Sequence, residues 1–351
     1  MQLFKIKILI LLLSTAHFSS SSSLIFYSSS DSDYNTIPPL RYLDLWSVQG
    51  HFGNFLGTPI SPYHFITVNH IEAQKSINVN GVTYPVLTFY DDWGSNLRIY
   101  KIIGKFPKYI QLYEKNEEIG KNVMVFGRGV GRGGEILLNN ELRGWEWNNV
   151  GGQIKWGENI VDAVSISYGG DALKMFFNPN KNLPDLCSLS IGDSGGGVFI
   201  QDDGVWKLAG INYAVDSIYG FNNLMGDEDI PFQGAIFNEK GLYKFDGQWW
   251  YEMKDKTSSG SYAVRVSSRS FWIKRMMEWT YPVVDLTLQS SDNLTGPYVD
   301  EPLVFNDINS QEVLIPLPLQ TKFFRVSYKD RLKIKKIYVK ENKLVIAYGR
   351  L

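Results

Sequence analysis

The chain has 351 residues, of which 44% are hydrophobic, and its 35 lysines and arginines nearly balance its 36 aspartates and glutamates. This length is large for one hydrophobic core and suggests about two domains. The absence of a basic excess argues against nucleic acid as a partner. A content of 32 glycines together with 14% aromatic residues favours short strands joined by turns.

Residues 1–22 are predicted to be a secretory signal peptide. Lys5 and Lys7 precede the apolar run 8–13, and small residues follow from Ser14 to Ala16. A basic start, a short apolar run and a small-residue exit are typical of such signals. The apolar run is far shorter than the ~20 residues that cross a bilayer, so no stable membrane span is expected. We therefore expect a secreted or periplasmic protein.

The remaining chain divides into three regions by composition. Residues 23–38 are rich in serine and are predicted to be a polar leader. Residues 39–280 consist of short apolar runs separated by Gly, Asn and Asp, which indicates antiparallel β structure, as a barrel or a sandwich. Residues 283–351 read as a small β module. The domain organisation is thus a signal, a leader, one large β domain and one small one.

Two elements can be placed more closely within these regions. The apolar residues of 268–279 recur at helical spacing, which predicts a helix at the end of the large domain. In the last stretch, apolar and basic residues alternate on either side of Glu341-Asn342, which predicts a β-hairpin.

A candidate nucleophile lies in the glycine-rich stretch Gly192-Asp193-Ser194-Gly195-Gly196-Gly197. A serine hydroxyl becomes reactive when a base takes its proton and N–H donors stabilise the oxyanion that forms. Glycines allow the tight turn that exposes such a serine. Taken alone, a glycine-rich segment with one serine also occurs in ordinary turns.

The base for this serine would be a histidine. Outside the predicted signal the chain has His51, His64 and His70, and His70 ends the apolar run 65–69. No carboxylate or cysteine lies near them at metal-ligand spacing, so neither a metal nor another cofactor is expected. Cys187 is the only cysteine, which excludes an internal disulfide, and we interpret it as a buried apolar side chain.

Four segments together resemble the chymotrypsin-like (trypsin-like) serine peptidases. Residues 65–71 are similar to the family's strand that ends in Thr-Ala-Ala-His-Cys, and residues 192–196 look like its serine motif. Residues 207–211 resemble the strand after the nucleophile, and residues 261–273 resemble the last strand and the C-terminal helix. These matches occur in the family's order. The lack of disulfides fits an exported, bacterial-type member.

The resemblance implies an all-β fold of two six-stranded antiparallel β-barrels with a C-terminal helix. It also implies a serine endopeptidase that hydrolyses peptide bonds of protein or peptide substrates through an acyl-enzyme. His70 would be the general base, Ser194 the nucleophile, and the N–H groups of Gly192 and Ser194 the oxyanion hole. Ser188 matches the base of the specificity pocket, where a neutral residue disfavours arginine or lysine in the substrate.

The third catalytic member of the family is an aspartate at the start of a strand. Here the matching strand begins at Asn96, while Asp91 and Asp92 lie a few residues upstream. Either a loop brings Asp92 to His70, or Asn96 replaces the acid. We favour Asn96 and therefore expect weakened peptidase activity, because an asparagine can hold the imidazole in the wrong tautomer. The alternative function is a catalytically weak or inactive peptidase-like domain that serves as a binding module.

Overall fold

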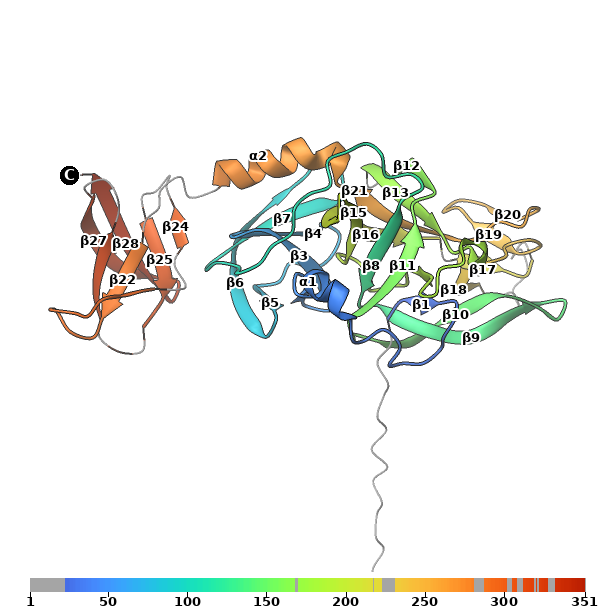
Figure 1. Ribbon diagram of the computed structural model, residues 1–351, viewed down its shortest axis with the longest axis horizontal. Coiled ribbons are helices and arrows are strands. Elements are labelled where there is room, and N and C mark those ends of the chain that lie inside the picture. The colour runs from blue at the N-terminus through green and yellow to red at the C-terminus, as the bar shows by residue number, and fades with distance from the viewer. Residues whose placement is uncertain are drawn as a thin grey trace, which may run out of the picture.

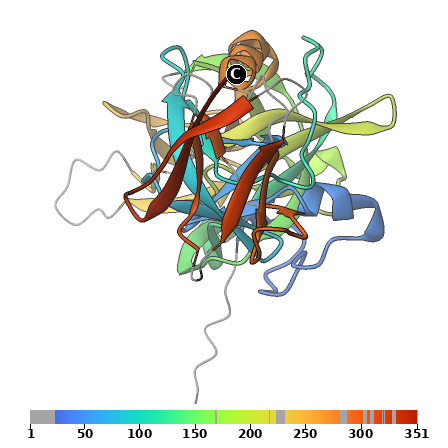
Figure 2. The same cartoon turned by 90° about the vertical axis from the view of Figure 1, so that its left-hand side faces the viewer.

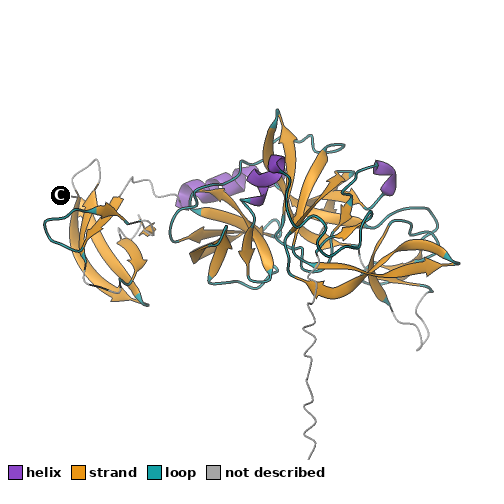
Figure 3. Cartoon of the chain, turned by 60° about the horizontal axis from the view of Figure 1, so that its bottom comes forward, coloured by secondary structure: helices purple, strands orange, loops and turns teal. Residues whose placement is uncertain are grey.

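The computed structural model describes residues 23–167, 170–216, 218–222, 231–280, 287–301, 305–307, 312–318, 320, 322–327 and 332–350. Almost all of its regular structure is strand, and the few helices are short (Figure 3). The all-β fold class predicted from the sequence is confirmed, and the architecture fits the chymotrypsin-like fold. The predicted signal, residues 1–22, lies outside the described residues.

The first half of the large domain is a closed six-stranded antiparallel barrel, in the order β2-β3-β4-β7-β6-β5. Its interior is filled by aromatic and branched side chains, because alternate residues of each strand point inward. Phe65 stacks on Tyr100 with ring centroids 4.9 Å apart, and Phe52 packs against both rings. The barrel strands are β2 (Gly50–Phe52), β3 (Phe55–Ser61), β4 (His64–Val68), β5 (Ser76–Val79), β6 (Val82–Asp91) and β7 (Leu97–Ile102).

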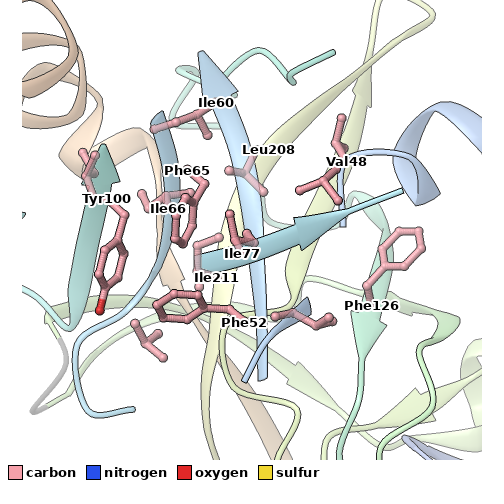
Figure 4. Close-up of a cluster of buried hydrophobic side chains, with 14 of the residues drawn as sticks. Val48, Phe52, Ile60, Phe65, Ile66, Ile77, Tyr100, Phe126, Leu208 and Ile211 are labelled. Carbon is pink, nitrogen blue, oxygen red and sulfur yellow. The ribbon is translucent and has the colours of Figure 1, made fainter. Parts of the chain in front are cut away.

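The second half contains a seven-stranded sheet in the order β11-β8-β15-β16-β21-β13-β12. One hydrophobic cluster joins this sheet to the barrel, since Phe126, Leu208 and Ile211 pack with the barrel residues Phe52 and Ile77 (Figure 4). The strands are β8 (Asn122–Gly127), β11 (Lys155–Ile160), β12 (Ala163–Ser167), β13 (Gly170–Phe176), β15 (Gly197–Asp202), β16 (Val205–Val215) and β21 (Gly260–Arg265).

A second sheet in this half, of six strands, has the order β20-β19-β17-β18-β10-β9. It is built on the long hairpin of β9 and β10, which extends beyond the seven-stranded sheet (Figure 1). In the described residues, therefore, only the first half closes as a barrel. The strands are β9 (Val130–Leu138), β10 (Glu141–Gly151), β17 (Ile218–Gly220), β18 (Phe232–Ile236), β19 (Tyr243–Phe245) and β20 (Trp250–Glu252).

The fold begins earlier in the chain than the sequence predicted. The short strand β1 (Ile25–Phe26) pairs with β14 (Cys187–Ser188), and residues 24–26 are almost fully buried. The prediction of a polar leader over residues 23–38 was therefore wrong for its first residues. Leu24, Ile25 and Phe26 form an apolar triplet between two serine runs, and all three are buried in the core. Burying one such side chain stabilises a fold by about 1.5–3 kcal/mol.

Short helices complete the large domain. The predicted helix is present as α2 (Ser270–Thr280), which packs beside β7 and follows a 3₁₀ turn, η3 (Ser267–Arg269). The others are η1 (Leu40–Tyr42), α1 (Leu43–Trp46) and η2 (Pro179–Lys181). None of the helices in the described part of the chain is long and apolar enough to cross a bilayer.

The small module beyond α2 has its own core of Leu288, Val313, Ile315, Ile346 and Tyr348. Figure 2 views the chain from this end, with the red strands of the module in front. The predicted terminal hairpin is present, and Glu341 and Asn342 adopt positive φ angles of 50° and 60° in its turn. The strands are β22 (Thr287–Ser291), β23 (Val299–Asp300), β24 (Phe305–Asp307), β25 (Glu312–Pro316), β26 (Phe323–Ser327), β27 (Leu332–Lys340) and β28 (Lys343–Arg350).

Candidate active site

A chain of hydrogen bonds joins three side chains that are far apart in the sequence. His70 Nε2 lies 3.0 Å from Ser194 Oγ, and His70 Nδ1 lies 2.6 Å from Asn96 Oδ1. His70 follows β4, Asn96 immediately precedes β7, and Ser194 lies in the turn before β15. The antiparallel pairing of Val68 with Leu97 sets His70 and Asn96 side by side. This geometry allows the imidazole to take a proton from the serine hydroxyl.

Asp92 does not bond to His70 in this arrangement. Its carboxylate accepts hydrogen bonds from the Gly94 N–H and from Ser95 Oγ, and it pairs with Arg269 at 3.2 Å. The side chain is 7% exposed, so these contacts hold it inside its own loop. Of the two residues considered for the acid position, the structure places Asn96 against the imidazole and uses Asp92 to anchor the loop to η3.

The other two histidines lie elsewhere. His64 is fully buried in β4 and lies 2.7 Å from Ser61 through its Nδ1 atom. Burial lowers the pKa of His64 to about 3, so its ring is neutral at physiological pH. His51 lies on β2, and partial burial together with the charge of Arg128 lowers its pKa as well.

The turn that carries Ser194 is held against both halves of the domain. The Gly195 N–H donates to the carbonyl of Asn212, and the Leu56 N–H lies 3.4 Å from the carbonyl of Ser194. Gly195 has a φ of +82°, and a Cβ there would lie 2.1 Å from the carbonyl oxygen of Leu56. Only glycine fits this position, which explains part of the glycine-rich motif.

The backbone amides of Gly192 and Ser194 lie in the same turn as the Ser194 hydroxyl. Within the described part of the chain, neither amide donates a hydrogen bond to another protein group. Backbone N–H groups of this kind can stabilise an oxyanion.

The buried carboxylate of Asp193 holds the turn that carries Ser194 through hydrogen bonds. Its carboxylate accepts hydrogen bonds from the N–H groups of Gly129 and Ser190, at 2.6 and 2.7 Å, and from the hydroxyls of Ser190 and Ser23. The side chain is 1% exposed, and this burial raises its pKa to about 6, against the opposing effect of the hydrogen bonds. The turn that carries Ser194 is therefore held by a buried carboxylate.

The glycine-rich segment 127–134 lies against the turn that carries Ser194. A Cβ on Gly127 would lie 2.2 Å from Asp193 Oδ1, and one on Gly129 would lie 2.4 Å from the carbonyl of Ile191. These glycines let β8 and the start of β9 approach the serine turn. The signal in the sequence was the glycine run itself, but its contact with residues 190–193 is tertiary.

A pocket of about 260 Å³ opens beside Ser194 and His70. Its walls combine apolar and polar side chains and come from the residues before Ser194, from the end of β16 and from the six-stranded sheet. Asp193 also lines it, but the Asp193 carboxylate is turned to Ser190 and Gly129. The lining residues are His70, Trp147, Leu189, Ser190, Ile191, Gly192, Asp193, Ser194, Asn212, Tyr213, Ala214, Val215 and Gln233.

Ser188 does not line this pocket, contrary to the prediction from the resemblance. It is 1% exposed, its backbone pairs with Ile25, and its hydroxyl bonds to the Leu189 carbonyl and lies 3.3 Å from Ser261 Oγ. The pairing with β1 keeps Ser188 in the core, and Leu189 lines the pocket instead. Two residues on the far wall, Trp147 of β10 and Gln233 of β18, were also missed, because nothing near the serine in sequence identifies them.

The described residues contain no group of three or more His, Cys, Asp or Glu side chains that could hold a metal ion. Cys187 is 2% exposed in β14, and burial raises the pKa of its thiol well above the ordinary value.

Comparisons with known proteins add little to this geometry. No protein-family model matches the chain, and no curated protein matches it significantly. Among the solved structures that match is the inactive form of a serine-to-alanine mutant of Rv3671c from M. tuberculosis H37Rv. It is 11% identical, with a TM-score of 0.39, and the match covers 73% of this chain and 97% of that one. A likeness at this level carries no argument about fold or chemistry.

Proposed function

We propose that this chain is a chymotrypsin-like serine endopeptidase that cleaves protein or peptide substrates through an acyl-enzyme at Ser194. The observation that carries the proposal is the hydrogen-bonded chain from Asn96 through His70 to Ser194, with separations of 2.6 and 3.0 Å. A nucleophilic serine requires an oriented imidazole as its general base, whereas an ordinary surface serine requires none. We also propose export, on the basis of the predicted signal.

In the proposed reaction, Ser194 Oγ bonds to the carbonyl carbon of the scissile peptide while its proton passes to His70 Nε2. The Gly192 and Ser194 N–H groups donate to the resulting oxyanion. The imidazolium then gives its proton to the amine nitrogen as the C–N bond breaks, which leaves the acyl group on Ser194. Water, deprotonated by His70, hydrolyses this ester in the same way.

The pocket supports a preference for an uncharged substrate side chain. Leu189, Ala214, Val215 and Trp147 form apolar walls, and the carboxylate of Asp193 is occupied by its own donors. Among the described lining residues Asp193 is the only carboxylate, and it is already hydrogen-bonded, so a cationic substrate side chain would gain no ion pair there, which is costly.

A fluorophosphonate probe tests the proposal, because it reacts with activated serines only. We expect wild type to be labelled at Ser194, as located by mass spectrometry, and Ser194→Ala and His70→Ala to remain unlabelled. Ser258→Ala is the control and should label normally, because Ser258 precedes β21 and its hydroxyl bonds to the Phe237 carbonyl rather than to His70.

A second function is supported by one specific observation, the neutral Asn96 at the acid position. An inactive domain that binds peptides would show no labelling, and it would keep its peptide affinity in Ser194→Ala. That pair of results would refute the peptidase proposal.

A further inference from the structure

Asn96 alone does not determine which of its two polar atoms faces His70. The carboxamide can present either its oxygen or its NH₂ group, and the two differ by a half-turn of the side chain. If the oxygen faces Nδ1, the ring carries its proton on Nδ1 and leaves Nε2 free to accept. If the NH₂ group faces Nδ1, the proton moves to Nε2, and Ser194 meets a donor where it requires a base.

A second asparagine, Asn69, contacts the Asn96 amide and bears on this choice. Asn96 Nδ2 donates to Asn69 Oδ1 at 2.7 Å, and Asn96 Oδ1 faces His70 Nδ1 at 2.6 Å. The NH₂ group of Asn96 therefore has an acceptor on the side away from His70. The Asn69 N–H also donates to the Asn96 carbonyl at 2.9 Å, so the ends of β4 and β7 hold the two side chains next to each other.

We propose that Asn69 is a positioning residue, which turns the Asn96 amide so that His70 carries its proton on Nδ1 and can act as a base toward Ser194. The consequence for catalysis rests on the proposed function, but the orientation itself does not. The four groups form one line of donors and acceptors, from Asn69 Oδ1 through Asn96 and His70 to Ser194. An uncharged residue at the acid position then keeps the correct tautomer, which answers the wrong-tautomer expectation drawn from the sequence.

The same contacts show which changes would reverse the orientation of the Asn96 amide. If both amides turned over, Asn69 would donate to Asn96, and Asn96 Nδ2 would face His70 Nδ1. A leucine at position 69 offers Asn96 neither a donor nor an acceptor, so both orientations of the Asn96 amide become accessible. An aspartate at position 69 can only accept when ionised, so it fixes the productive orientation.

The test uses two readouts on the full-length protein, the protonated nitrogen of His70 and the labelling rate of Ser194. Nitrogen NMR of ¹⁵N-histidine protein at about pH 9, well above the ordinary histidine range, reports which nitrogen is protonated. The signals of His70 are assigned by their loss in His70→Gln. The variants are Asn69→Leu, alone and combined with Asn96→Asp, and Asn69→Asp alone. Asn78→Leu is the control, since that amide bonds to Thr83 instead.

We expect wild type, Asn69→Asp and Asn78→Leu to carry the proton on Nδ1. Asn69→Leu should show a substantial Nε2–H population, and its labelling should slow by about tenfold or more, toward the ~10⁴-fold loss of a wrong tautomer. With Asn96→Asp present, Asn69→Leu should leave the tautomer unchanged, because both carboxylate oxygens accept. A folding defect would instead appear in both backgrounds.

An Nε2–H tautomer in wild type, or an unchanged tautomer in Asn69→Leu, overturns the inference even if Ser194 labels well. If the tautomer responds as expected but no variant labels, the positioning role stands and the peptidase proposal fails.

Discussion

The substitution Asn96→Asp measures what the neutral residue at the acid position costs. Its side chain would meet His70 Nδ1 at the present separation of 2.6 Å, and Asn69 can turn its amide to donate to the new carboxylate. The tautomer stays the same. The change is confined to the charge that faces the imidazolium during the reaction.

The expected increase in rate follows from this added charge alone. A hydrogen bond to a charged group contributes about 1.5–3 kcal/mol, against about 1 kcal/mol for a neutral one. A difference of about 1–2 kcal/mol corresponds to a rate increase of roughly 5- to 30-fold. His70 is exposed, so solvent screening prevents a larger value. This is far below the ~10⁴-fold effect of exchanging Asp and Asn where the amide also imposes the wrong tautomer.

The assay is the second-order rate of fluorophosphonate labelling near pH 8, compared with kcat/KM on a peptide that carries an apolar side chain before the scissile bond. Asp92→Asn is the control, because that carboxylate serves its loop and Arg269. An increase near 10⁴ would show that the tautomer is wrong in wild type, and no increase would show that Asn96 does not act on the base. Either result refutes the reasoning.

Three further results are expected. Ile25→Ala should lower the free energy of unfolding by about 2–5 kcal/mol, because this side chain is fully buried; a change below about 0.5 kcal/mol in urea unfolding, the level of a surface site, would contradict the burial of β1. Gly127→Ala, whose Cβ would lie 2.2 Å from Asp193 Oδ1, should slow labelling by about tenfold or more, whereas Gly134→Ala, with its nearest atom at 3.8 Å, should not. The pKa of His64 is lowered from 6.5 to about 3 by burial, so the stability conferred by the neutral ring is present above pH 6.5 and is lost as the pH falls. Between about pH 7 and 5 protonation linked to His64 should remove roughly 2 kcal/mol of stability. His64→Gln should flatten the dependence of the free energy of unfolding on pH, and an equal dependence in both proteins would show that His64 is not its source.

The candidate site could be assembled from the sequence only in part. Ser194 and His70 were identified because their local patterns are distinctive, a glycine-rich turn and a strand that ends in histidine. Asn96 was favoured over Asp92 on strand position, and the structure places it against the imidazole. Ser188 was misplaced, because the pairing of β14 with β1 turns it away from the pocket. Trp147 and Gln233 could not be predicted, since they reach the pocket from a sheet that has no sequence signal near the serine.

The all-β class, the C-terminal helix and the terminal hairpin were determined by the sequence alone, because strand alternation, helical spacing and turn residues are local properties. The serine turn was local only in part: positive φ angles require glycine at positions 192 and 195, but Gly195 and Gly196 also make room for the distant carbonyls of Leu56 and Phe126. The tertiary structure decided what the sequence left open. The register of β4 and β7 brings Asn69, Asn96 and His70 into one line, and the burial of residues 24–26 begins the domain at what had been interpreted as a leader. Both depend on contacts between segments distant in the chain, and a local pattern carries no information about which distant segment it will meet.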